Sequence, residues 1–74
     1  MAYRIRTFRD LRTNDVYEVA ASEQYLPPLR RRIVQECGGD PEWENESVFQ
    51  YQAGLDVEMP GEIDRPVVRI ERPG

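Results

Sequence analysis

The alternation of apolar and polar side chains predicts two strands in the first third of the chain. In residues 3–8 the side chains fall alternately on two sides, with Tyr3, Ile5 and Thr7 on one side and Arg4 and Arg6 on the other. This period of two is typical of a half-buried strand. Residues 16–21 form a second predicted strand, after a connection whose Asn14 and Asp15 favour a turn. Together they predict an antiparallel hairpin.

A helical pattern follows, which we expect to span residues 27–37. Pro27 and Pro28 suit a first turn, where the missing N–H would have no partner, and Gly38 with Gly39 supplies a left-handed cap at the other end. At a period of 3.6 residues, one stripe contains Leu26, Leu29, Ile33 and Cys37, with Val34 at its edge. We expect this stripe to pack on the sheet, and we expect Arg30, which lies beside the stripe, to be the one arginine that is partly covered.

The second half of the chain predicts a short helical turn and two further strands. An acid, a proline and an acid at residues 40–42 favour a helix start, so a single turn is expected through about residue 45. From Phe49 to Met59 every odd position is apolar or aromatic, and Gly54 interrupts the pattern and favours a bulge or bend. Residues 67–71 form the last predicted strand, at a sheet edge because a proline precedes it.

The element order predicts an α+β fold. It consists of a small antiparallel sheet of about four strands in β-β-α-β-β order, with one main helix packed on one face. We expect one domain over residues 1–74, because a chain of 74 residues has no room for a second core. Whether residues 49–53 and 55–59 form one bent strand or two stays open. The edge strand at residues 67–71 could also pair with a second copy in a homodimer.

Composition removes most catalytic chemistry. All ten basic residues are arginine, histidine is absent, and Cys37 is the single cysteine. Histidine general bases, lysine Schiff bases and histidine or multi-cysteine metal sites are therefore excluded. Cys37 would lie at the negative end of the helix dipole, which disfavours its thiolate. We expect no enzymatic activity, no cofactor and no metal site.

The same inventory suggests where the protein works. A single cysteine cannot form an internal disulfide, and the first residues contain no apolar block that resembles a signal peptide. No stretch of the sequence has the length and apolar character needed to cross a bilayer. We expect a cytoplasmic protein that does not associate with membranes.

Charge is distributed unevenly along the chain. Residues 1–37 contain seven arginines and five acidic residues, a net charge of +2, whereas residues 38–74 contain three arginines and nine acidic residues, a net charge of −6. The acidic segment near residue 43 lacks the glycine and ligand spacing of a calcium loop, and a chain this short hardly provides the opposed walls that carboxylate catalysis needs. Two alternatives remain: a solvated acidic turn with Trp43 folded onto the sheet, or an aromatic anchor ringed by negative charge.

The second alternative leads to the main functional hypothesis, a small non-catalytic protein-interaction module. Its acidic surface would bind a protein partner that presents a basic surface. The expected partner-binding residues are Glu42, Trp43, Glu44, Glu46, Asp56 and Glu58. A compact acidic domain can also imitate the charge of nucleic acid and block a basic groove, as phage-encoded inhibitors including anti-CRISPR proteins do. That comparison is one of size and charge and involves no sequence motif.

The arginine-rich part of the chain supports an alternative hypothesis, a nucleic-acid-binding module. Arginines gathered on one face would contact phosphates, with aromatic side chains stacking on bases. The expected residues are Arg4, Arg6, Arg9, Arg31 and Arg32. The sequence pI of about 4.7 and the lack of a nucleic-acid-binding signature make this the less favoured hypothesis.

Overall fold

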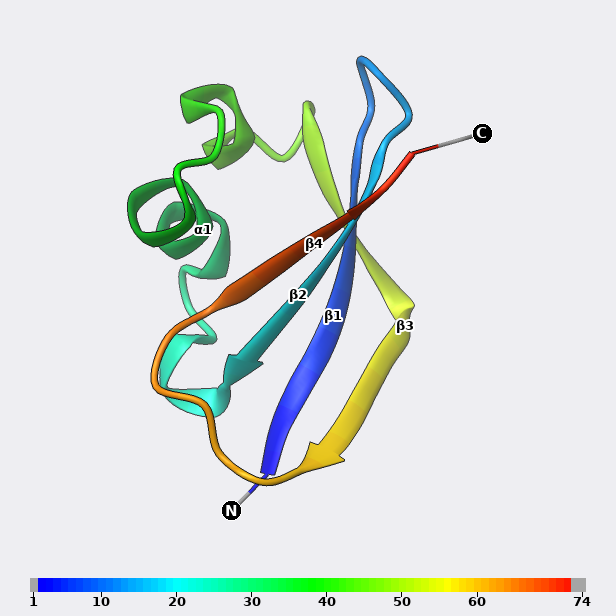
Figure 1. The fold of residues 1–74 in the computed structure, drawn as a ribbon. Helices are drawn as coiled ribbons and strands as arrows, with labels where there is room; N and C mark the ends of the chain where they lie inside the picture. Colours follow the sequence, from blue (N-terminus) through cyan, green and yellow to red (C-terminus); the bar gives the residue numbers. More distant parts are fainter. Residues whose placement is uncertain (1, 73–74) are drawn as a thin grey trace.

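In the computed structural model, which describes residues 2–72, four strands form one antiparallel sheet (Figure 1). They are β1 (Ala2–Asp10), β2 (Val16–Ser22), β3 (Phe49–Pro60) and β4 (Val67–Glu71). Their spatial order is β3-β1-β2-β4, so β4 is an edge strand, as its sequence predicted. The main helix and two short 3₁₀ helices lie on one side of this sheet (Figure 1). The predicted α+β fold is confirmed.

The predicted hairpin is β1 and β2. Phe8 lies directly opposite Tyr17, and the pairing runs without interruption from Tyr3 to Arg9. In the connecting turn Asn14 adopts a positive φ of 67°, a conformation that asparagine tolerates better than most residues. The N–H of Asn14 donates to the carbonyl oxygen of Asp10 at 2.7 Å and closes the turn.

The main helix, α1 (Leu29–Cys37), begins two residues later than predicted. Pro28 has extended backbone angles and is the N-cap, the residue that precedes the first helical one. The helix ends where expected, with Gly38 in the left-handed conformation at φ 71°. Leu29 and Ile33 of the predicted stripe are buried, but Leu26 precedes the helix and is exposed.

Two 3₁₀ helices flank α1. The first, η1 (Glu23–Tyr25), follows β2 directly, and the second, η2 (Pro41–Glu44), is the short turn that the sequence predicted. Asp40 caps η2, since its Oδ1 accepts a hydrogen bond from the backbone N–H of Glu42 at 2.9 Å.

Residues 49–60 form one strand with a wide bulge. Residues 49–52 pair with the end of β1 and residues 57–60 pair with its start, while residues 53–56 lie opposite Arg6 alone. The sequence left open one bent strand or two, and the structure has one. The bulge falls at Gly54, as the sequence predicted.

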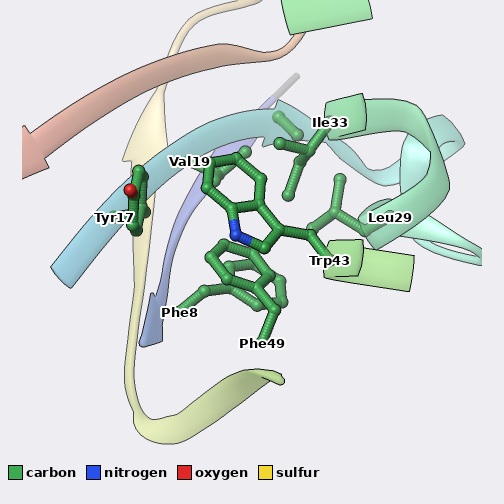
Figure 2. Packing of buried hydrophobic residues seen from close by; sticks show 8 residues of the cluster. Phe8, Tyr17, Val19, Leu29, Ile33, Trp43 and Phe49 are labelled. Carbon is green, nitrogen blue, oxygen red and sulfur yellow. The ribbon is translucent and has the colours of Figure 1, made fainter. Parts of the chain in front are cut away.

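The core lies between the sheet on one side and α1 and η2 on the other (Figure 2). Its aromatic side chains stack closely: the Phe49 ring is 5.0 Å from Phe8 and 4.6 Å from Trp43, both nearly parallel. Tyr17 meets the Trp43 ring edge-on at 4.6 Å. Figure 2 shows Trp43 between these rings and the aliphatic side chains of Ile33 and Leu29. Half of the eight buried core residues that the structure describes are therefore aromatic.

The half-buried pattern of β1 predicted Arg4 and Arg6 on the solvent side of the hairpin, and this is wrong. Phe8 points into the core, and alternation puts Arg6 and Arg4 on the same face. Arg6 is buried, with its side chain only 5% exposed, and it is the least exposed of the described arginines that form ion pairs. Arg30 is partly covered as predicted, with its side chain 28% exposed, but the prediction that it is the one such arginine is wrong, because Arg6 is more deeply buried.

Candidate functional site

The acidic segment after α1 is held to the helix by ion pairs. Glu44 lies 3.6 Å from Nε of Arg31, and Glu46 lies 3.9 Å from Nη2 of Arg30. Asp40 accepts a hydrogen bond from Arg12 at 2.6 Å. Each of these pairs places an arginine beside a carboxylate, so much of the negative charge expected on this segment is compensated within the chain. Glu42 is exposed at its tip.

Trp43 lies in the core and not on the surface. Its indole Nε1 donates a hydrogen bond to Oδ2 of Asp10 at 3.0 Å, and its ring stacks on Phe49. The structure thus has the first of the two arrangements that the sequence allowed, an acidic turn with the tryptophan folded onto the sheet. A buried side chain of this kind is not available as an anchor for a partner.

Asp10 is the buried carboxylate that holds Trp43 in place. Its Oδ1 accepts from the backbone N–H of Arg12 at 2.9 Å, and the Arg12 guanidinium donates to both oxygens at 3.4 Å. Burial acts to raise the pKa of Asp10, but the hydrogen bonds from Trp43 and Arg12 outweigh it and bring the pKa below its ordinary value. The charged form of Asp10 is therefore favoured in the folded protein.

We expect this carboxylate to make stability depend on pH. Because the pKa of Asp10 is lower in the folded than in the unfolded chain, its contribution is present above about pH 4 and is lost on acidification through the folded-state pKa. Asp10→Asn should lower the free energy of unfolding by about 1–3 kcal/mol at pH 7. The difference from wild type should narrow as the pH falls to about 3.

Urea unfolding of both proteins between these pH values measures that difference directly. The comparison with Asp10→Asn is needed because the pKa values of Asp40 and Asp56 are also lowered and contribute to the pH dependence of the wild type. Parallel pH curves for wild type and variant would show that Asp10 does not contribute through its charge.

A second polar cluster lies at the bulge of β3. Asp56 accepts a hydrogen bond from the Tyr51 hydroxyl on Oδ2 at 2.8 Å and another from Nη1 of Arg4 on Oδ1 at 3.2 Å. Nε of Arg6 is 3.6 Å from Oδ2. Burial acts to raise the pKa of Asp56, but the hydrogen bonds from Tyr51 and Arg4 and the charge of Arg6 bring it below its ordinary value. Burial and the neighbouring carboxylate both raise the pKa of Tyr51.

The arginines of the alternative hypothesis do not share one surface. Arg4 and Arg6 face the helices at the bulge cluster, whereas Arg9 lies on the other face of the sheet and donates to Asn14 at 3.4 Å. Arg31 is paired with Glu44 on the helix surface. Arg32 donates to Glu36 at 3.1 Å and lies over the ring of Tyr25 at 5.5 Å.

Glu58 belongs to an acidic groove at the opposite end of the molecule from the β1–β2 turn. The groove has a volume of about 540 Å³ and forms where the end of β2 and η1 meet the connection between β3 and β4. Its lining contains four acidic residues among eight: Ala2, Ser22, Glu23, Gln24, Glu58, Glu62, Ile63 and Asp64. All four acidic residues are exposed. We call these lining residues the acidic groove.

Sequence analysis found only Glu58 of this groove. Glu23 belongs to η1 and Asp64 to the connection after β3, so nothing in their spacing along the chain relates them. The strand order explains why they meet. β2 and β3 both pair antiparallel with β1, so both end beside the start of β1. The acidic residues that follow those two strands must therefore lie close together.

Comparison of the chain with protein-family models, curated proteins and solved structures found no match. The site must therefore be interpreted from its own geometry. Within residues 2–72, no three histidine, cysteine, aspartate or glutamate side chains are grouped in a way that could hold a metal ion. None of the helices in this described range has the length and apolar character to cross a membrane.

Proposed function

We propose that this protein is a small non-catalytic interaction module that binds a basic segment of a partner protein in the acidic groove. One observation supports this most: four carboxylate side chains from separate parts of the chain surround a single hollow. A concave surface lined with one sign of charge focuses its field and attracts groups of the opposite charge. Arginine suits such a groove because its planar guanidinium binds carboxylates through two parallel hydrogen bonds.

The acidic groove supports this function better than the segment around η2 does. Around η2, Glu44 and Glu46 already have arginine partners in the chain. At the groove, Arg4 approaches Glu58 only to 3.8 Å while donating to Asp56. The pKa of Arg4 is raised, first by Asp56 and then by the charges of Glu58 and Glu23. Among the described residues Glu23 and Asp64 have no ion pair, so the groove keeps negative charge.

A module of this kind inhibits its partner when it covers a basic segment that the partner uses to bind nucleic acid. This keeps the inhibitor hypothesis, with the acidic groove in place of the tryptophan-centred surface. We do not extend the proposal to nucleic-acid binding, since the arginines that would contact phosphates are distributed over two faces of the sheet and the helix.

A titration with a hexa-arginine peptide tests the proposal. The double variant Glu23→Gln, Asp64→Asn should bind the peptide about fivefold more weakly than wild type, because each exposed ion pair contributes about 0.5 kcal/mol. The matched control Glu42→Gln, Glu71→Gln removes the same charge from exposed positions outside the groove and should change the affinity less than about twofold. Calorimetry at one low salt concentration measures all three affinities.

Equal weakening by the two double variants would contradict the proposal. It would mean that net charge alone attracts the peptide and that the groove has no special part in binding.

A further inference from the structure

A second hollow, of about 420 Å³, lies between the bulge of β3 and the start of α1. This volume lies within the range of about 300–1,000 Å³ that is usual for small-ligand sites. Its lining combines apolar side chains with charged ones, and both kinds come from the sheet and from the helix side. Its lining includes Arg6, Phe8, Leu26, Pro27, Pro28 and Asp56. It is separate from the acidic groove, with which it shares no residue.

Arg6 brings an unused hydrogen-bond donor to this hollow. Its side chain is 5% exposed, and within the described residues its Nη1 has no hydrogen-bond partner. Asp56 does not supply one: it lies beside the guanidinium as an ion-pair partner, 3.6 Å from Nε, and Nη1 forms no hydrogen bond with it. A buried guanidinium N–H without a partner is costly, and an anion in the hollow would remove that cost.

The start of α1 adds positive character from the opposite wall. The N-cap is Pro28, and no side chain of the described residues forms a capping hydrogen bond there. The first turn of α1 contains no acidic residue. The N–H of Leu29 donates to the carbonyl oxygen of Leu26 at 3.0 Å and that of Arg32 to Pro28 at 3.2 Å, so the N–H groups of residues 30 and 31 are the ones at this end that neither bond uses. The helix dipole makes this end attractive to anions. Arg30 and Arg31 of the same turn also line the hollow. Two independent features, a buried arginine and an uncapped helix start, therefore point to an anion at the same place.

The other side chains narrow the class of anion. Asp56 and Glu44 line the hollow too, so a doubly charged phosphate would meet two carboxylates. The side chains of Phe8, Leu26 and Pro27 offer an apolar wall instead. We infer that the hollow binds a single carboxylate carried on a small apolar group, with the carboxylate between Arg6 and the first turn of α1. Such a group occurs in a free fatty or aromatic acid and at the C-terminus of a polypeptide that ends in an apolar residue.

Amide chemical shifts of the ¹⁵N-labelled wild-type protein test the inference. Hexanoate should give saturable shifts at residues 29–31, 51 and 56, while hexanamide, which has the same tail without the charge, and inorganic phosphate should not. The peptide acetyl-Gly-Gly-Leu with a free carboxylate distinguishes the two sources. Tighter binding of the peptide than of hexanoate assigns the site to a chain terminus, and the reverse assigns it to a free acid.

Two variants check that the arginines bind the carboxylate. Arg6→Met keeps the length of the side chain but removes the donors, and should weaken hexanoate binding at least about tenfold. Arg30→Met alters a partly exposed side chain that lines the hollow, and should weaken binding about threefold. Arg69→Met, exposed on the edge strand β4 and outside the hollow, is the matched control and should leave the affinity unchanged.

The inference is overturned if neither hexanoate nor the peptide gives saturable shifts. It is also overturned if hexanamide or phosphate binds as well as hexanoate, or if Arg30→Met binds hexanoate as the control does.

Discussion

Phe49→Ala is expected to lower the free energy of unfolding by about 3–5 kcal/mol. The Phe49 side chain is fully buried, at 0% exposure, and its ring contacts the rings of Phe8, Trp43 and Tyr17. Removing it leaves a cavity among rigid aromatic side chains, which cannot collapse to fill it. A domain of this length has a total stability of roughly 4–11 kcal/mol, so the variant should be close to unfolding at room temperature.

Urea unfolding followed by circular dichroism measures the effect without relying on Trp43, whose fluorescence would change with its neighbour. Leu55→Ala is the control: Leu55 lies in the bulge of β3 at 56% exposure, and its loss should change the stability by no more than about 0.5 kcal/mol. A Phe49→Ala protein that is within about 1 kcal/mol of wild type would show that the aromatic cluster is not the core.

Gly39→Ala is expected to destabilise the protein by about 1–3 kcal/mol through overpacking. A Cβ at Gly39 would lie 2.5 Å from Cε3 and Cζ3 of Trp43, well inside contact distance. The ring cannot move away easily, because it stacks on Phe49 and its Nε1 is bonded to Asp10. The single methyl group therefore disturbs both the aromatic core and the buried carboxylate.

Gly54→Ala provides the comparison for this prediction. A Cβ at Gly54 would meet no atom within 4 Å, so this variant should be within about 1 kcal/mol of wild type in the same urea measurement. If the two alanine variants were equally stable, the close approach of Gly39 to Trp43 would have no energetic consequence, and the placement of the indole would be wrong.

Local patterns predicted the elements of this fold well, because each depends on residues near in sequence. Pro28 and Gly38 delimit α1, and Gly54 marks the bulge. The orientation of β1 was harder, since an arginine is expected to face solvent. Arg6 instead lies on the core face, where the bulge brings Asp56 beside it. No pattern within residues 2–10 contains that information.

The candidate sites show the same division between local and long-range information. The acidic segment at residues 40–46 is conspicuous in sequence, yet arginines of α1 compensate Glu44 and Glu46. The acidic groove is inconspicuous, because Glu23 and Asp64 meet only through the order of the strands. The sequence shows where the negative residues lie along the chain. Whether an arginine lies beside each of them depends on the three-dimensional arrangement.

The proposed function depends on where a basic segment binds, and chemical-shift mapping with the hexa-arginine peptide measures this most directly. The proposal predicts that the largest amide shifts fall at residues 22–24, 58 and 62–64, around the acidic groove. Shifts that are largest at residues 42–46, or that are spread evenly over the surface, would contradict it.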